Sequence, residues 1–106
     1  MLRGKMIPIE GYDFEGPFDS CNLVNDVAGV YVILCLTGRD YTVMDIGEST
    51  KLYTRLSSHD RDGCWRSHCS GELFVAVLYT QGRSDLERRK IEEELRDQFT
   101  PPCGKR

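Results

Sequence analysis

The sequence lacks long apolar runs, internal repeats and low-complexity tracts. No stretch approaches the roughly 18 apolar residues of a membrane span, so we expect no membrane partner. The first eight residues also lack the apolar stretch of a secretory signal peptide. The composition, with 40% hydrophobic and 29% charged residues, excludes collagen-like, coiled-coil and disordered chains. A length of 106 residues fits one domain.

A basic excess, the usual sign of a nucleic-acid-binding chain, is also missing. Lys and Arg number 14 against 17 Asp and Glu, which gives a net charge of −3. Residues 1–28 carry two basic and five acidic side chains, whereas residues 29–106 carry twelve of each sign. The chain therefore divides into an acidic leader, 1–28, packed on or linked to a neutral core domain, 29–106.

The number of cysteines is odd, at five, and no export signal accompanies them. This combination predicts free thiols in a reducing compartment, and hence a cytoplasmic location. Cys64, His68 and Cys69 invite a zinc interpretation. Their spacing is not that of a CxxC pair, and no second ligand pair follows at a usual distance. The pattern favours reduced cysteines in a loop or in the core over a structural zinc site.

Apolar patterning predicts three strands. Residues 29–36 form a near-continuous apolar run rich in β-branched side chains, which is typical of a buried strand. Residues 41–46 form a second strand, and the four-residue break between the two predicts an antiparallel hairpin. Residues 73–79 are apolar on both faces, as in the central strand of a covered sheet. Residues 1–28 are punctuated by Pro and Gly, and we expect at most a short strand or turn there.

A first helix is expected from Ser49, a suitable N-cap, to about His59. Leu52 and Leu56 form its apolar stripe, and Arg55 and His59 fall on the same stripe. Either these two side chains extend from the rim of the buried face, or they face a site formed with the hairpin. Residues that follow, up to position 71, are polar and rich in turn formers.

A second helix begins at a capping box in 84–87 and ends near residue 99, before two prolines. Ile91 and Leu95 belong to its apolar stripe. Of three consecutive glutamates, Glu92 lies nearest that stripe, and the other two belong to the solvent face. The predicted fold is thus α+β, with a small three-stranded antiparallel sheet flanked by helices.

Five polar residues lie where apolar ones are expected: Tyr31, Asp45, Arg55, His59 and Glu92. Tyr31 by itself has a simpler interpretation, a core tyrosine whose hydroxyl reaches the edge. Together the five residue types can serve one reaction. One carboxylate can hold Mg²⁺ through a single oxygen, a Tyr or His can take a proton from water, and an Arg can clamp a phosphate. These are the parts of metal-assisted phosphodiester hydrolysis.

The order and spacing of these residues resemble the GIY-YIG nuclease superfamily over residues 29–104. The matching positions are Gly29, Val30 and Tyr31, then Asp45, Ile46 and Gly47, then Ser49, Leu52, Arg55 and His59, then Glu92, Phe99, Pro101 and Pro102. The resemblance implies a three-stranded antiparallel sheet flanked by helices, in agreement with the patterning.

The resemblance also implies an activity and roles for residues. The chain would be a metal-dependent endonuclease acting on nucleic acid, DNA rather than RNA. Tyr31 would contact or deprotonate the attacking water, Arg55 would bind the scissile phosphate, and His59 would stand beside that arginine. Glu92 would be the lone protein ligand of Mg²⁺ or Mn²⁺. A homodimer is one way for so small a nuclease to cut both strands.

Two positions depart from the family pattern. Asp45 occupies a place where the family usually has Tyr, so the phenol is lost and a negative charge is added near the expected phosphate path. The alternative is that the new carboxylate serves as a second metal ligand. Gly104 stands where the family tends to have Asn. Both departures leave open a GIY-YIG-fold module without cleavage, which binds nucleic acid or a protein.

Two further alternatives concern the surface. Lys51, Arg61 and Arg66 could form a basic face on one side of the first helix and the following loop. Trp65 either stacks on a base or covers the edge of the core, and the second is the more usual place for a large aromatic. A zinc-binding interaction domain would depend on Cys64, His68, Cys69 and Cys103.

Overall fold

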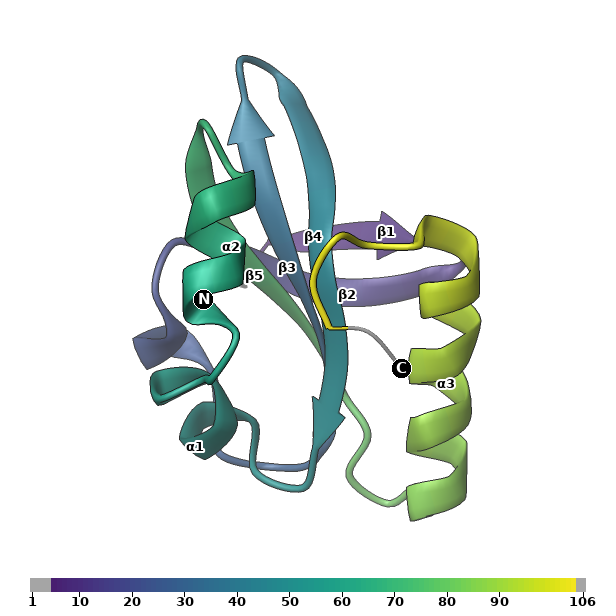
Figure 1. Ribbon diagram of the computed structural model, residues 1–106. Helices are drawn as coiled ribbons and strands as arrows, with labels where there is room; N and C mark the ends of the chain where they lie inside the picture. The colour runs from purple at the N-terminus through teal and green to yellow at the C-terminus, as the bar shows by residue number, and fades with distance from the viewer. Residues whose placement is uncertain (1–4, 105–106) are drawn as a thin grey trace.

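The computed structural model describes residues 5–104, which form one five-stranded antiparallel sheet with helices on both faces (Figure 1). The strands lie in the spatial order β1-β2-β5-β3-β4. The elements are β1 (Met6–Ile9), β2 (Tyr12–Phe18), the 3₁₀ turn η1 (Cys21–Leu23), β3 (Gly29–Thr37), β4 (Asp40–Ser49), α1 (Leu52–Ser57), α2 (Asp62–His68), β5 (Glu72–Tyr79) and α3 (Asp85–Phe99). The α+β class predicted from the patterning is confirmed.

The three predicted strands are present as β3, β4 and β5. β3 and β4 form the expected antiparallel hairpin, from Gly29 opposite Ser49 to Thr37 opposite Asp40. β5 pairs with β3 on one side and with β2 on the other, so it is the central strand. Its central residues are buried because helices cover both faces of the sheet.

The prediction of a three-stranded sheet is wrong, because part of the leader adds two more strands. β1 and β2 form a hairpin in which Ile9 pairs with Tyr12. Glu10 and Gly11, which join them, both have positive φ, at 49° and 86°, as a tight hairpin turn requires. Phe14 on β2 is fully buried, and Glu15 pairs with Val77 of β5. Residues 6–18 of the leader are therefore integrated into the sheet.

The first helix is shorter than expected, and Ser49 is not its N-cap. Lys51 holds the N-cap position of α1 without a side-chain cap, and the Ser49 hydroxyl instead accepts a hydrogen bond from the Lys51 backbone N–H. His59 lies beyond the helix end. The segment predicted as a loop contains α2, whose apolar anchor is the buried Trp65.

The last helix follows the prediction closely. Ser84 and Glu87 form the expected reciprocal capping box, and the helix ends at Phe99. Ile91 and Leu95 are buried against the sheet, and Glu92 is half-buried beside them. No helix among residues 5–104 combines the length and apolarity needed to span a bilayer.

Two apolar clusters lie on opposite faces of the sheet, because successive β3 side chains point to opposite sides. Val30 and Val32 join Ile91 and Leu95 under α3. Tyr31 and Ile33 join the cluster under α1 and α2, which contains Trp65. Tyr31 therefore points away from α3 and toward the two short helices.

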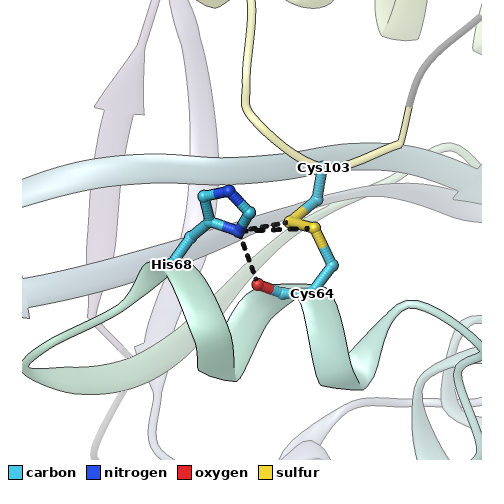
Figure 2. A group of neighbouring side chains, drawn as sticks. All are labelled: Cys64, His68 and Cys103. Carbon is cyan, nitrogen blue, oxygen red and sulfur yellow. Dashed lines mark hydrogen bonds between the residues drawn. A yellow bond between two sulfur atoms is a disulfide. The ribbon is translucent and has the colours of Figure 1, made fainter.

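Four of the five cysteines form disulfides, so the prediction of free thiols is wrong for them. Cys35 is bonded to Cys69. Cys64 is bonded to Cys103, as Figure 2 shows. Cys21 is free. The partners are 34 and 39 residues apart, and only the folded sheet brings them together. Because persistent disulfides are rare in reducing compartments, the cytoplasmic expectation loses the argument on which it was based.

Candidate functional site

A polar pocket of about 200 Å³ collects three of the four predicted catalytic residues. Tyr31 reaches it from β3, Arg55 from α1 and Glu92 from α3. The other lining residues are Gly47, Glu48, Arg61, Arg96 and Gly104. Side chains from distant parts of the chain thus converge where the C-terminal half of β4 passes between α1 and α3.

His59, the fourth predicted residue, contacts the pocket through Tyr31. Its Nε2 lies 2.5 Å from the Tyr31 hydroxyl oxygen, and its side chain is fully buried. Gly47 makes this arrangement possible, since a Cβ there would lie only 2.2 Å from the same hydroxyl oxygen. Tyr31 is thus a core tyrosine whose hydroxyl also faces the pocket.

The hydrogen bonds of His59 fix its tautomer. The backbone N–H of Arg61 donates to Nδ1 at 3.1 Å, so Nδ1 carries no proton and the neutral ring carries its proton on Nε2. Nε2 then donates to the Tyr31 oxygen, which also accepts from Arg61 Nη2 at 3.2 Å. Burial, aided by Arg55 and Arg61, lowers the pKa of His59 to about 4, so the ring is neutral at pH 7.

Tyr31 is a protonated phenol at neutral pH. Burial raises its pKa to about 12, although Arg61 acts in the opposite direction. Because its oxygen already accepts two hydrogen bonds, the hydroxyl proton is free to point elsewhere. The Tyr31 hydroxyl therefore keeps one proton that it can donate to a further acceptor.

The arginines of the pocket form a gradient of exposure. Arg55 is 36% exposed and pairs with the surface carboxylate of Asp60 at 2.9 Å. Arg61 is 28% exposed and Arg96 only 8%. Arg55 is thus the cation that a ligand in solution reaches first, and its present partner is easily exchanged because exposed ion pairs are weak.

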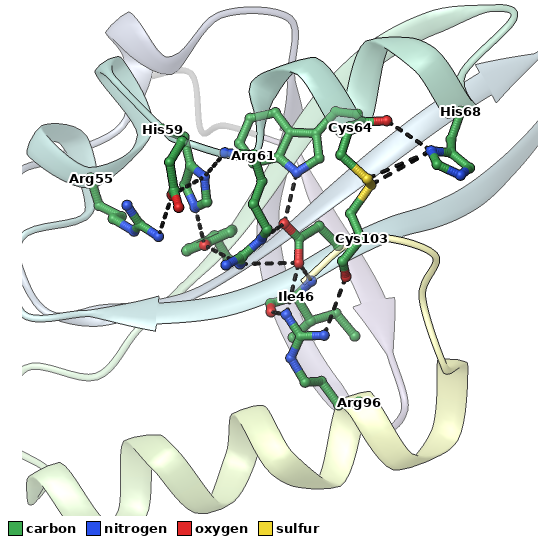
Figure 3. Close-up of polar contacts among 12 residues, drawn as sticks. Ile46, Arg55, His59, Arg61, Cys64, His68, Arg96 and Cys103 are labelled. Atoms are coloured by element: carbon green, nitrogen blue, oxygen red, sulfur yellow. Dashed lines mark hydrogen bonds and ion pairs between the residues drawn. A yellow bond between two sulfur atoms is a disulfide. The ribbon is translucent and has the colours of Figure 1, made fainter. Parts of the chain in front are cut away.

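Asp45, on β4, organises the floor of the site. Figure 3 shows Arg61 and Arg96 approaching this floor from opposite sides. Asp45 is fully buried. Arg61 Nε donates to its Oδ2 at 2.7 Å and Arg96 Nη2 to its Oδ1 at 2.8 Å. Trp65 Nε1 donates to Oδ2 at 2.7 Å, and the backbone N–H of Ile46 donates to Oδ1. One carboxylate therefore joins β4, α2 and α3.

This environment argues against Asp45 as a second metal ligand. Both of its oxygens are saturated by donors, two of them cationic, so no lone pair is directed at a metal. The residue instead holds Arg61 and Arg96 at the pocket. Gly104 fits the same cluster, since a Cβ there would lie 2.4 Å from both Arg96 Nη2 and Asp45 Oδ1, and its φ is +74°. An asparagine at this position has no room.

Glu92 has one oxygen committed and one available. Arg96 Nε donates to its Oε2 at 2.8 Å, and Glu92 lines the polar pocket, so Oε1 is the oxygen left for a ligand. A single carboxylate oxygen with space for water is the protein contribution that Mg²⁺ commonly accepts. The residues present therefore fit a divalent cation held by Glu92.

Two residues expected on a basic face lie apart from the pocket. Arg66 is exposed and forms an i,i+4 ion pair with Asp62 at 2.8 Å. Lys51 is exposed at the start of α1, and neither residue lines the pocket. Arg61 does line it. Trp65 covers the edge of the core, as its size favours, and its contact with Asp45 gives it a second, polar task.

Sequence reasoning missed Arg96. Its position four residues after Glu92 was a usable signal, because i,i+4 side chains share a helix face. Its contacts with Asp45 and with the Ile46 carbonyl had no such signal. The buried pair of Arg88 with Glu48, 2.5 Å apart, was missed for the same reason.

Comparisons of the chain with protein-family models, curated proteins and solved structures gave no match. The site must therefore be interpreted from its own geometry.

Proposed function

We propose that this chain is a metal-dependent endonuclease that hydrolyses phosphodiester bonds, with DNA as its substrate and a GIY-YIG-type site. The observation that supports this most strongly is the pocket itself. Tyr31, Arg55 and Glu92, which the resemblance selects from three separate parts of the chain, line one small polar cavity. Three arginines and a half-buried carboxylate are a composition suited to a phosphate and a divalent cation.

Arg55 and Arg61 are the phosphate-binding groups in this proposal. Arg55 is the more exposed, and its exchange of Asp60 for a phosphodiester replaces a weak surface pair with a charge-assisted hydrogen bond. Arg61 is oriented by Asp45 and by the Tyr31 oxygen. Its guanidinium is therefore held ready to stabilise negative charge that develops on the phosphate.

Tyr31 orients the attacking water or a phosphate oxygen by donating its hydroxyl proton. With a pKa of about 12 the phenol stays protonated at neutral pH, so water contact is favoured over deprotonation by Tyr31. His59 holds the tyrosine in place through its Nε2 proton. Glu92 would hold Mg²⁺ or Mn²⁺, and a bound divalent cation acidifies its water and neutralises phosphate charge.

The test is cleavage of plasmid and branched DNA by the purified protein with Mg²⁺ or Mn²⁺. We expect Glu92→Gln to lower the cleavage rate by about 10²-fold or more, since one directed charge contributes that much to catalysis. Glu93→Gln, an exposed neighbour on the same helix, is the matched control and should keep the wild-type rate. Cleavage that survives Glu92→Gln contradicts the proposal.

A second candidate, binding of nucleic acid without cleavage, is favoured by one observation. Asp45 pairs with both Arg61 and Arg96, and Glu92 also pairs with Arg96, so the exposed Arg55 is the arginine most available to a phosphate. The same experiment separates the two candidates when a gel-shift assay accompanies it. DNA binding that Arg55→Gln abolishes, without cleavage in any divalent cation, would establish the binding module.

A further inference from the structure

A cluster of metal-ligand side chains lies outside the polar pocket, on α2 and the segment after α3. Cys64, His68 and Cys103 present ligand-type atoms that all lie within 4.8 Å of one another. His68 Nδ1 is 3.6 Å from Cys64 Sγ and 3.9 Å from Cys103 Sγ, and Figure 2 shows the ring nitrogen directed at both sulfurs. None of the three residues lines the pocket around Arg55.

The backbone holds the three residues together without help from the disulfide. Cys64 and His68 are four residues apart on α2 and therefore share one helix face. The backbone N–H of Cys103 donates to the Met44 carbonyl at 3.0 Å, and Arg96 Nη1 donates to the Cys103 carbonyl at 3.4 Å. Cys103 thus stays next to α2 when its sulfur is released from Cys64.

We propose that Cys64, His68 and Cys103 form a Zn²⁺ site in the reduced protein, so that the metal and the Cys64–Cys103 disulfide are alternative occupants of one place. Tetrahedral zinc, with Zn–S near 2.3 Å and Zn–N near 2.05 Å, separates a sulfur and a nitrogen ligand by about 3.6 Å. Both nitrogen-to-sulfur distances already lie close to this value. Only the two sulfurs must move apart, from 2.11 Å to about 3.8 Å.

The exchange balances as a thiol–disulfide reaction followed by metal binding. A low-molecular-weight thiol supplies two equivalents, the Cys64–Cys103 bond breaks, and the reductant becomes its own disulfide. The two new thiols release two protons as their sulfurs bind Zn²⁺. The His68 ring moves its proton to Nε2, so that Nδ1 exchanges its 3.0 Å hydrogen bond to the Cys64 carbonyl for the metal. Water fills the fourth position, because His68 is exposed and the cluster opens to solvent.

The donor set selects the metal. Two thiolates and an imidazole favour zinc over magnesium, calcium or manganese. Cys69, adjacent to His68 in sequence, does not belong to this cluster of ligand atoms, and its sulfur lies at Cys35 instead. The zinc site proposed from the structure therefore keeps Cys64, His68 and Cys103 of the set suggested by the sequence and leaves out Cys69.

The test uses the full chain, the metal alone and a count of bound ions. The protein is reduced anaerobically, freed of reductant, mixed with ZnCl₂ and desalted. We expect about one zinc per reduced chain and almost none in the oxidised protein. Co²⁺ in place of Zn²⁺ should give the intense near-ultraviolet charge-transfer band of thiolate ligation, and that band should be absent before reduction.

Variants assign the ligands. Cys64→Ser, Cys103→Ser and His68→Asn should each weaken zinc binding by about tenfold or more, because each removes one of three protein ligands. Cys21→Ser and Cys69→Ser are the matched controls, and both should bind zinc as the reduced wild type does. Circular dichroism of each variant verifies that a loss of zinc is not a loss of fold.

A second measurement avoids substitutions. Bound Zn²⁺ should slow alkylation of Cys64 and Cys103 in the reduced wild type, mapped by mass spectrometry, and leave Cys21 as reactive as before. The proposal is overturned if reduced protein binds no zinc, if oxidised protein binds it equally, or if Cys64→Ser leaves binding unchanged. Unchanged binding in His68→Asn would also overturn the three-ligand site.

Discussion

The two faces of the sheet are built by different means. Under α3 the packing is aliphatic, with residues such as Val32, Ile91 and Leu95 and one long, capped helix. Under α1 and α2 the helices have six and seven residues, which is too short for stability by themselves. That face contains Tyr31, Trp65, both disulfides and the buried Asp45.

The comparison shows which face of the sheet can hold polar functional side chains next to the core. A face stabilised by hydrophobic burial has no place for unpaired polar groups. The face with short helices replaces part of that burial with covalent bonds and hydrogen bonds to Asp45, so polar side chains can lie next to the core. The candidate site lies at the edge of this second face. The α3 face and the α1/α2 face should therefore respond differently to reduction and to substitutions.

The largest expected effect is that of reduction, which acts on one face only. A thiol reductant with a metal chelator should lower the free energy of unfolding by about 2–4 kcal/mol for each disulfide, given loops of 34 and 39 residues. Hydrogen exchange should then increase in α2 and near Cys103 while the amides of α3 stay protected. Equal loss of protection on both faces would contradict the division.

Asp45→Asn should have the next largest effect. It removes the one carboxylate that Arg61 and Arg96 share, and a buried ion pair broken in this way typically costs about 3–5 kcal/mol. Urea denaturation measures the loss. Asp40→Asn, at the exposed start of the same strand, is the control and should change stability by less than about 0.5 kcal/mol. A loss of similar size in both variants would show that Asp45 has no organising role.

Leu95→Ala tests the opposite face. The side chain is 1% exposed, and its truncation should cost about 3 kcal/mol through lost burial and a cavity. The cost should be the same with and without reductant, since no disulfide lies on that side. Leu86→Ala, at a position 74% exposed on the same helix, should be nearly neutral. A Leu95 effect that doubles under reduction would mean that the faces are coupled.

The smallest predicted effect depends on pH. The pKa of His59 is about 4 in the folded protein against an ordinary value of 6.5, so between these values the unfolded chain binds a proton that the folded chain does not. Stability should therefore decrease as the pH falls from about 6.5 toward 4, by about 2 kcal/mol at pH 4.5. His59→Gln should remove this dependence, whereas His68→Gln, at an exposed position, should keep it. Parallel curves for both variants would contradict the assignment.

Local signals predicted much of the fold. The apolar runs of β3 and β5 and the capping box at Ser84 are properties of neighbouring residues, so they could be found without knowledge of tertiary structure. The β1–β2 hairpin was missed because Pro8 and Gly16 suggested irregular chain. Pro8 lies in an edge strand, where the missing N–H has little cost.

The candidate site also contains residues that could be predicted from the sequence and contacts that could not. Tyr31, Arg55 and Glu92 were selected by spacing and by the resemblance. The contact of Asp45 with Arg96 spans 51 residues, and no periodicity connects positions so far apart. The interpretation of Asp45 as a metal ligand failed because its four donor groups come from three elements that only the folded chain brings together.

The two disulfides also overlap in sequence, since Cys64 precedes Cys69. The two loops that they close overlap and together cover residues 35–103. A single cut of the backbone at any point between Cys35 and Cys103 therefore leaves the pieces covalently joined. A protease that nicks the β3–β4 turn or the loop before α3 therefore releases no fragment from the oxidised chain. In this state the molecule behaves toward proteolysis as a closed network, and reduction turns it back into a linear polymer.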